Sequence, residues 1–153
     1  MRVRGHEAEN DAERERLRAL VARLSDDELR RAMPGGWTVA GVLGHAGFWD
    51  ARVIALLDRY ARGVAPSTDD YEPATAVDWV NDSAKPFILA LAPRDAAALT
   101  LRLAEDADRK VAALSDEMLA KLDAAGPAGA PFNLSRAEHR REHLDEIEAA
   151  LRA

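Results

Sequence analysis

Two histidines stand four residues apart near the C-terminal end of the sequence, at His139 and His143. If this segment is helical, both side chains lie on one face of the helix, a single turn apart. A rigid helix with this spacing offers two imidazoles to one metal ion before the ion arrives. Such a pair also arises by chance on an exposed helix, so the pair alone is a weak signal.

The position of the pair relative to the apolar residues strengthens the signal. On a helical wheel, the stripe through His139 and His143 borders the apolar stripe of Leu144 and Ile147. The imidazoles therefore face neither bulk solvent nor the middle of a core. We expect them at the rim of a buried face, where a pocket between packed helices can form.

A third histidine, His45, occupies a similar place in an earlier segment, beside Trp49 at one edge of an apolar face. On its own, His45 is better explained as a core histidine that bonds to a carbonyl or a carboxylate. Together with His139 and His143, it predicts a three-histidine metal site inside a helical bundle. The fourth histidine, His6, lies in a charged N-terminal segment, and we do not include it in the site.

Three histidines leave coordination positions open on an ion, and an open site can lower the pKa of bound water and polarise a substrate atom. Glu142 and Glu146 are candidates for carboxylates that orient a ligand or act as a base. A solvated helix face is the simpler explanation for both. For Asp50, one turn after His45, the same two explanations apply, a role beside the metal site or a solvated helix face.

Two further residues are assigned to the surroundings of the site. Arg140 falls within the apolar stripe of the last helical segment. It therefore either pairs with a carboxylate of a neighbouring helix, which we favour, or lines the pocket mouth for an anionic substrate group. Trp49, like Trp37 and Trp79, is expected in the core or in a pocket wall rather than in a stacking platform for bases.

The composition favours a helical globular protein. Of the 153 residues, 48% are hydrophobic and 31% are charged, and a single domain over residues 1–153 fits this length. Aromatic residues make up only 5%, whereas alanine, leucine and arginine dominate. Because strands draw on β-branched and aromatic residues, this balance predicts helices.

Charge and cysteine content exclude several kinds of function. The formal net charge of -6 argues against nucleic acid as the main partner. The chain has no cysteine, so histidine and carboxylate must supply any metal ligands. No apolar run approaches the roughly 20 residues of a membrane span, and no signal peptide is recognisable. We therefore expect a cytoplasmic protein with no membrane partner.

Helical periodicity covers most of the chain and indicates an all-α four-helix bundle with short extra helices in the connections. The predicted helical segments are residues 7–24, 39–62, 76–92, 94–114 and 135–152, with short helical turns near 25–28 and 116–122. Residues 64–75 and 124–132 read as loops, and no segment reads as a strand. Pro86 is expected to kink or split its helix.

Local signals mark where two of these helices begin. Thr38 is a good N-cap for the second helix, directly after the break at 34–36. Ser135, with Glu138 three residues later, predicts a capping box at the start of the last helix.

Two motifs resemble those of a known family. The segment Gly36-Trp37-Thr38-Val39-Ala40-Gly41-Val42-Leu43-Gly44-His45, followed by Phe48-Trp49-Asp50, is similar to the second-helix motif of the DinB-like superfamily. His139-Arg140-Arg141-Glu142-His143 resembles its His-x3-His motif near the start of the last helix. That superfamily groups DinB proteins with the N-terminal domains of mycothiol-dependent maleylpyruvate isomerases.

The resemblance implies a metal-binding four-helix bundle that is frequently a homodimer. Its ligands would be His45, His139 and His143, and its ion nickel or zinc. Members with known activity are thiol-dependent transferases and isomerases that act with mycothiol or bacillithiol, or metal-dependent hydrolases. Because the sequence offers no separate C-terminal domain, we do not expect isomerase activity.

Three hypotheses follow for the function. The first is a metalloenzyme that activates water or a low-molecular-weight thiol, such as mycothiol, for attack on a small-molecule substrate. The second is a non-catalytic protein that binds a small molecule in the same pocket, in a stress-protective role. The third is a purely structural bundle whose histidines are core residues and hold no metal.

Overall fold

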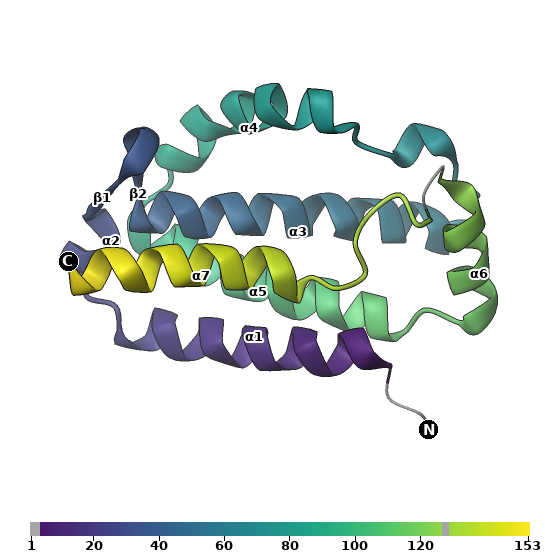
Figure 1. Ribbon diagram of the computed structural model, residues 1–153, viewed down its shortest axis with the longest axis horizontal. Helices are drawn as coiled ribbons and strands as arrows, with labels where there is room; N and C mark the ends of the chain where they lie inside the picture. Colours follow the sequence, from purple (N-terminus) through teal and green to yellow (C-terminus); the bar gives the residue numbers. More distant parts are fainter. Residues whose placement is uncertain (1–3, 127–128) are drawn as a thin grey trace.

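The computed structural model describes residues 4–126 and 129–153 of the chain. Figure 1 shows four long helices lying side by side. They are α1 (Gly5–Arg23), α3 (Val39–Ala61), α5 (Pro93–Ala112) and α7 (Ala137–Arg152). α1 and α3 each pack against both α5 and α7, which closes the bundle. The prediction of an all-α bundle is confirmed.

The main core lies between these helices and follows the predicted apolar stripes. Leu17, Leu20 and Leu24 of the first stripe are buried, as are Leu144 and Ile147 of the last helix. Burying side chains of this size typically stabilises a fold by about 1.5–3 kcal/mol each, before the entropy cost of ordering them. Within the described residues, no helix has both the length and the apolar character that a membrane span requires.

A short hairpin leads into α3. It consists of β1 (Ala32–Met33), the 3-10 turn η1 (Pro34–Gly36) and β2 (Trp37–Thr38), and the short helix α2 (Asp26–Arg30) precedes it. The two strands pair antiparallel, so the expectation that no segment forms a strand is wrong at this place. Gly35 and Gly36 have φ angles of 73° and 78°, a left-handed conformation that glycine adopts at little cost. The glycine pair thus permits the turn that brings Trp37 to the start of α3.

Thr38 caps α3, since its Oγ1 accepts a hydrogen bond of 2.9 Å from the backbone N–H of Gly41. Farther along α3, Gly44 lies so close to α4 (Ala74–Leu89) that an added Cβ would stand 2.6 Å from the side chain of Ile88. The missing side chain lets α4 lie directly on α3. α4 continues as one helix past Pro86 to Leu89, so of the two predicted effects, a kink or a split, the split is absent.

The remaining connections contain two short elements. η2 (Thr68–Asp70) lies in the segment expected to be an exposed loop, but Asp70 is buried and accepts a hydrogen bond of 2.8 Å from the Tyr60 hydroxyl. α6 (Asp116–Ala125) is capped by the hydroxyl of Ser115. In the predicted linker loop, Gly126 and Gly129 form an isolated bridge, and residues 127–128 of that loop lie outside the described residues.

The start of α7 differs from the prediction. The cap comes from Asn10 of α1, whose Oδ1 accepts hydrogen bonds from the backbone N–H groups of Arg136 at 2.7 Å and Ala137 at 3.0 Å. The predicted capping box of Ser135 and Glu138 is wrong, because the Ser135 hydroxyl contacts a carboxylate of α1 instead. The backbone N–H groups of Arg136 and Ala137 have no acceptor within the helix, and both residues are buried. The buried amide of Asn10 reaches them, whereas the hydroxyl of Ser135 does not.

Candidate metal centre

The structure brings the three predicted histidines together. His45 stands on α3, and His139 and His143 stand one turn apart on α7. The Nε2 atom of His139 lies 3.3 Å from that of His45 and 2.9 Å from that of His143. One ring nitrogen from each residue lies within 4.8 Å of the other two.

These separations suit ligands of a single ion. Two nitrogens bound to zinc at about 2.0–2.1 Å, with an angle of about 90–110° between them, lie roughly 2.8–3.4 Å apart. Both measured Nε2 separations fall in this interval. The donor set, three imidazoles and no thiolate, matches zinc or nickel rather than a hard cation such as magnesium or calcium. The residues present therefore fit a divalent transition metal.

The protonation of the cluster also suits metal binding. Burial, and to a smaller extent the neighbouring His143, lowers the pKa of His45 to about 4. Burial likewise lowers the pKa of His139 to about 3, and the adjacent histidines and arginines add to this effect. Both rings are therefore neutral near pH 7, with a lone pair free for an ion.

Two neighbours orient the rings. The Nδ1 atom of His143 lies 3.1 Å from Oε2 of Glu146, so an N–H at Nδ1 donates to the carboxylate and Nε2 keeps its lone pair. The His45 ring packs against Trp37 in a T-shaped arrangement, with 5.7 Å between the ring centroids. The hairpin before α3 thus places an aromatic wall beside the cluster.

A cavity of about 910 Å³ opens beside two of the three histidines. Its walls come from the hairpin, α3, α4 and α7, and the lining residues are Met33, Pro34, Trp37, Val42, His45, Asp78, Asn81, Asp82, His143, Glu146, Ala149 and Ala150. His139 does not line it and lies behind the other two. A small molecule in the cavity would therefore approach the cluster from the side of His45 and His143.

Comparison with known protein families decides the classification. The sequence profile of the DinB superfamily matches residues 9–147, which is most of the chain and includes all three histidines of the cluster. The chain belongs to the DinB superfamily. A comparison with curated proteins and a comparison with solved structures each found no match.

Of the four surrounding residues predicted for this DinB protein, Trp49, Arg140 and Glu142 do not line this cavity. Trp49 stands on α3, and its Nε1 donates a hydrogen bond of 2.8 Å to Oδ1 of Asn81 on α4. Glu142 is exposed on the outer side of α7. Glu146 differs from both, since it lines the cavity and contacts a histidine of the cluster.

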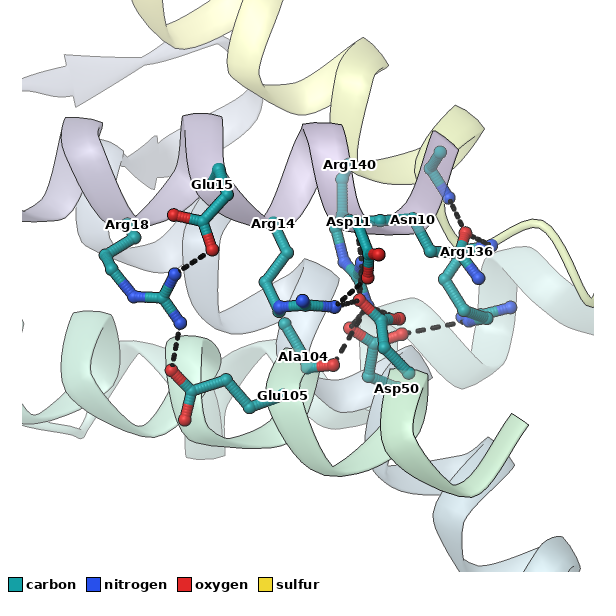
Figure 2. Close-up of polar contacts among 12 residues, drawn as sticks. Asn10, Asp11, Arg14, Glu15, Arg18, Asp50, Ala104, Glu105, Arg136 and Arg140 are labelled. Atoms are coloured by element: carbon teal, nitrogen blue, oxygen red, sulfur yellow. Dashed lines mark hydrogen bonds and ion pairs between the residues drawn. The ribbon is translucent and has the colours of Figure 1, made fainter. Parts of the chain in front are cut away.

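Arg140 is buried in a network of ion pairs, the first of the two alternatives that the sequence left open. Its guanidinium forms two bonds with Asp108 of α5, at 2.7 and 2.8 Å, and one of 3.1 Å with Asp50 of α3 (Figure 2). Arg14 of α1 also reaches Asp108, at 2.7 Å. Burial opposes the charge on Arg140, but hydrogen bonds and charges from the two aspartates outweigh it and raise its pKa.

Asp50 is not on a solvated helix face, the simpler explanation that the sequence suggested. Its side chain is almost fully buried, and its two oxygens accept hydrogen bonds from Arg136 at 2.9 Å and Arg140 at 3.1 Å. The sequence carried one signal of this role, namely an arginine in an apolar stripe, which requires a buried carboxylate somewhere else in the fold.

The polar wall formed by α4 was missed by sequence reasoning. Asp78, Asn81 and Asp82 line the cavity, and their i, i+3 and i, i+4 spacing was a readable signal of one polar face. The assignment of Trp79 to the core or a pocket wall is wrong, because this side chain is 61% exposed. α4 buries Ile88 against α3 and presents three polar side chains to the cavity, while Trp79 and Phe87 remain exposed to solvent.

Proposed function

We propose that this DinB protein is a metal-dependent enzyme whose ion, zinc or nickel, is held by His45, His139 and His143. The convergence of three Nε2 atoms beside a large cavity carries the proposal. When bound, such an ion supplies a Lewis acid that makes a thiol or a water molecule a stronger nucleophile at neutral pH. The reaction is then a thiol-dependent transfer, with mycothiol as cosubstrate, or a hydrolysis.

The chain's own residues bind and orient the substrate in this proposal. The cavity has a volume within the range of about 300–1,000 Å³ that small-molecule sites occupy. Trp37 and Val42 offer apolar walls that exclude water, whereas Asp78 and Asp82 accept hydrogen bonds from the opposite side. Negative charge on that side favours a neutral or cationic substrate over an anionic one. Glu146, at the edge of the cluster, would hold the ring of His143 with its Nε2 toward the ion, since the carboxylate contacts Nδ1 of that ring.

The metal content of the purified protein tests the proposed site. We expect one divalent ion per chain and complete loss of high-affinity binding in His143→Ala, because two imidazoles cannot hold the ion as three do. The matched control is His6→Ala, which removes the histidine outside the cluster and should retain the ion. Elemental analysis and zinc titration measure both outcomes. Full occupancy in His143→Ala, or no ion in the unmodified protein, would show the proposal to be wrong.

A turnover assay separates catalysis from binding. Metal-loaded protein is incubated with mycothiol and an electrophilic model substrate, and in parallel with hydrolysable esters and amides. Multiple turnovers that disappear on chelation support the enzyme. Protection of one molecule of substrate per chain, without turnover, would instead support the alternative, a non-catalytic small-molecule binding protein that uses the same cavity.

We also propose that the protein forms a homodimer through the outer face of α4. Trp79 is 61% exposed and Phe87 is 80% exposed, although both are large apolar side chains on one helix. Exposed apolar patches of this kind mark interaction surfaces. A second copy is the occupant we favour, because a two-fold axis would pair each aromatic side chain with the same surface of the partner.

Sedimentation velocity tests the dimer. We expect the unmodified protein to sediment as a dimer and Trp79→Ser/Phe87→Ser as a monomer that keeps its helical content. Val64→Ser, which removes an apolar side chain exposed outside α4, is the control and should remain dimeric. A monomeric unmodified protein at all concentrations, or a dimer unaffected by the double substitution, would contradict the proposal.

A further inference from the structure

Two sets of non-covalent contacts, here called cross-links, join α3 to α7 in the same way. In one, His45 of α3 meets a pair of histidines four residues apart on α7, His139 and His143. In the other, Asp50 of α3 meets two arginines four residues apart, Arg136 at the N-cap just before α7 and Arg140 on α7 itself. Each cross-link thus brings one residue of α3 to two residues spaced four apart at the start of α7.

The two cross-links follow each other along the same helix pair. Figure 1 shows that α3 and α7 run in opposite directions, since α7 ends beside the start of α3. The arginine pair precedes the histidine pair by three residues on α7, and Asp50 follows His45 by five residues on α3. In an antiparallel helix pair, a step toward the end of one helix corresponds to a step toward the start of the other. The two cross-links are therefore neighbouring contacts along the pair. Asp50, Arg140 and His143 also line one small internal cavity, so the cross-links adjoin each other in space.

The cross-link at Asp50 restricts both sliding and rotation of α7. Its Oδ1 accepts from Nε of Arg136 at 2.9 Å and its Oδ2 from an Nη atom of Arg140 at 3.1 Å, so both oxygens are engaged on successive turns. A shift of α7 by one residue would break both bonds and leave buried charges unpaired, at a cost that a surface pair would not carry. The carboxylate and both guanidinium groups are buried.

We propose that Asp50 is a positioning residue for the metal centre. By fixing the register of α7 on α3, its carboxylate places the imidazoles of His139 and His143 opposite His45 before any ion binds. The proposal rests on the proposed function, in that the histidine cluster is the metal site. Asp50 touches no histidine of the cluster through a hydrogen bond, and it acts through the backbone of α7.

The test compares two aspartates that bind the same arginine. Asp50→Asn removes the charge that joins α3 to α7, whereas Asp108→Asn removes a charge on α5 and leaves the α3–α7 cross-link in place. We expect zinc affinity to fall about 10- to 100-fold in Asp50→Asn, the range found when groups that orient metal ligands are lost. In Asp108→Asn, we expect a change of less than about threefold, despite an equal or larger loss of stability.

Two spectroscopic measurements separate positioning from a general loss of structure. The visible spectrum of the cobalt-substituted protein should change in Asp50→Asn and stay unchanged in Asp108→Asn. In the metal-free protein, the imidazole NMR signals of the cluster should shift in Asp50→Asn alone. Arg136→Gln, which breaks one of the two bonds to Asp50, is the milder variant if Asp50→Asn does not fold, and it should lower zinc affinity to a smaller extent.

The outcomes distinguish this inference from the proposed function. Equal effects of Asp50→Asn and Asp108→Asn on zinc affinity and on the spectra would overturn the positioning role and leave the metal site standing. Absence of zinc binding in the unmodified protein would overturn the metal site itself. In that case, the NMR comparison of the metal-free variants still decides whether Asp50 sets the arrangement of the three rings.

Discussion

At the scale of single residues, the carboxylate of Glu146 fixes the ring of His143 through a contact of 3.1 Å to Nδ1. Glu146→Gln should therefore lower zinc affinity about tenfold, near the lower end of the usual effect, because the side chain is half exposed. A competition titration with a chromophoric chelator measures the change. The amide keeps a hydrogen-bond acceptor but loses the charge that favours the donating Nδ1–H.

Glu142 offers a matched control on the same helix, one turn earlier than Glu146. It is exposed and does not line the cavity, so Glu142→Gln should change zinc affinity by less than about twofold. If both substitutions weaken zinc binding to the same extent, the effect of Glu146 is a matter of net charge, and its contact with His143 contributes nothing specific.

The residues of the cluster could be predicted, but several of their neighbours could not. His139 and His143 are close in sequence, and the helical repeat alone places them on one face. The buried position of Arg140 was also readable from its place in an apolar stripe. Its partners Asp50 and Asp108 were not, since they stand on other helices and only the packing of the bundle decides which carboxylates it meets.

At the scale of helices, the amide of Asn10 joins the first helix to the start of the last. Asn10→Ala should lower the free energy of unfolding by about 1–3 kcal/mol, because two buried backbone N–H groups of α7 lose their acceptor. Chemical denaturation followed by circular dichroism measures the loss. Amide hydrogen exchange should accelerate most at Arg136 and Ala137.

Ser135→Ala is the control, because it tests the cap that the sequence suggests and the structure does not contain. The Ser135 hydroxyl makes an exposed contact with Glu9, so its loss should change the free energy of unfolding by less than about 0.5 kcal/mol. A larger loss for Ser135→Ala than for Asn10→Ala would restore the predicted capping box.

Helix positions were predictable wherever the signal lies within a turn of the chain. The cap at Thr38, the break at 34–36 and the short helical turns near 25–28 and 116–122 all depend on neighbours in sequence, and the structure contains them. The start of α7 and the exposure of Trp79 and Phe87 on α4 depend on residues far away in sequence. Apolar periodicity could not show that these two aromatic side chains stay outside the bundle, since it does not say which apolar residues of a helix meet its neighbours.

At the scale of the whole molecule, Asp108 joins three helices, because it pairs with Arg14 of α1 and Arg140 of α7 from its own place on α5. Asp108→Asn should lower the free energy of unfolding by about 3–5 kcal/mol, since it leaves a buried guanidinium without its bidentate partner. Denaturant midpoints at neutral pH measure the loss.

The comparison for Asp108 is Asp106→Asn, two residues earlier on the same helix. Asp106 pairs with Arg109, whose side chain is 75% exposed, and exposed pairs contribute about 0–1 kcal/mol. A similar loss for both substitutions would mean that the buried network is no more important to the fold than its surface ion pairs.

The contact between Asn10 and the start of α7 can form only late in the synthesis of the chain. Asn10 is translated long before α7, yet it can act only once α7 has emerged, and α7 carries two of the three histidines. A nascent chain that stops short of α7 holds His45 without the two other histidines of the cluster. If the proposed site binds an ion, only chains that extend through the last helix would load it, and truncated products would be left without that metal.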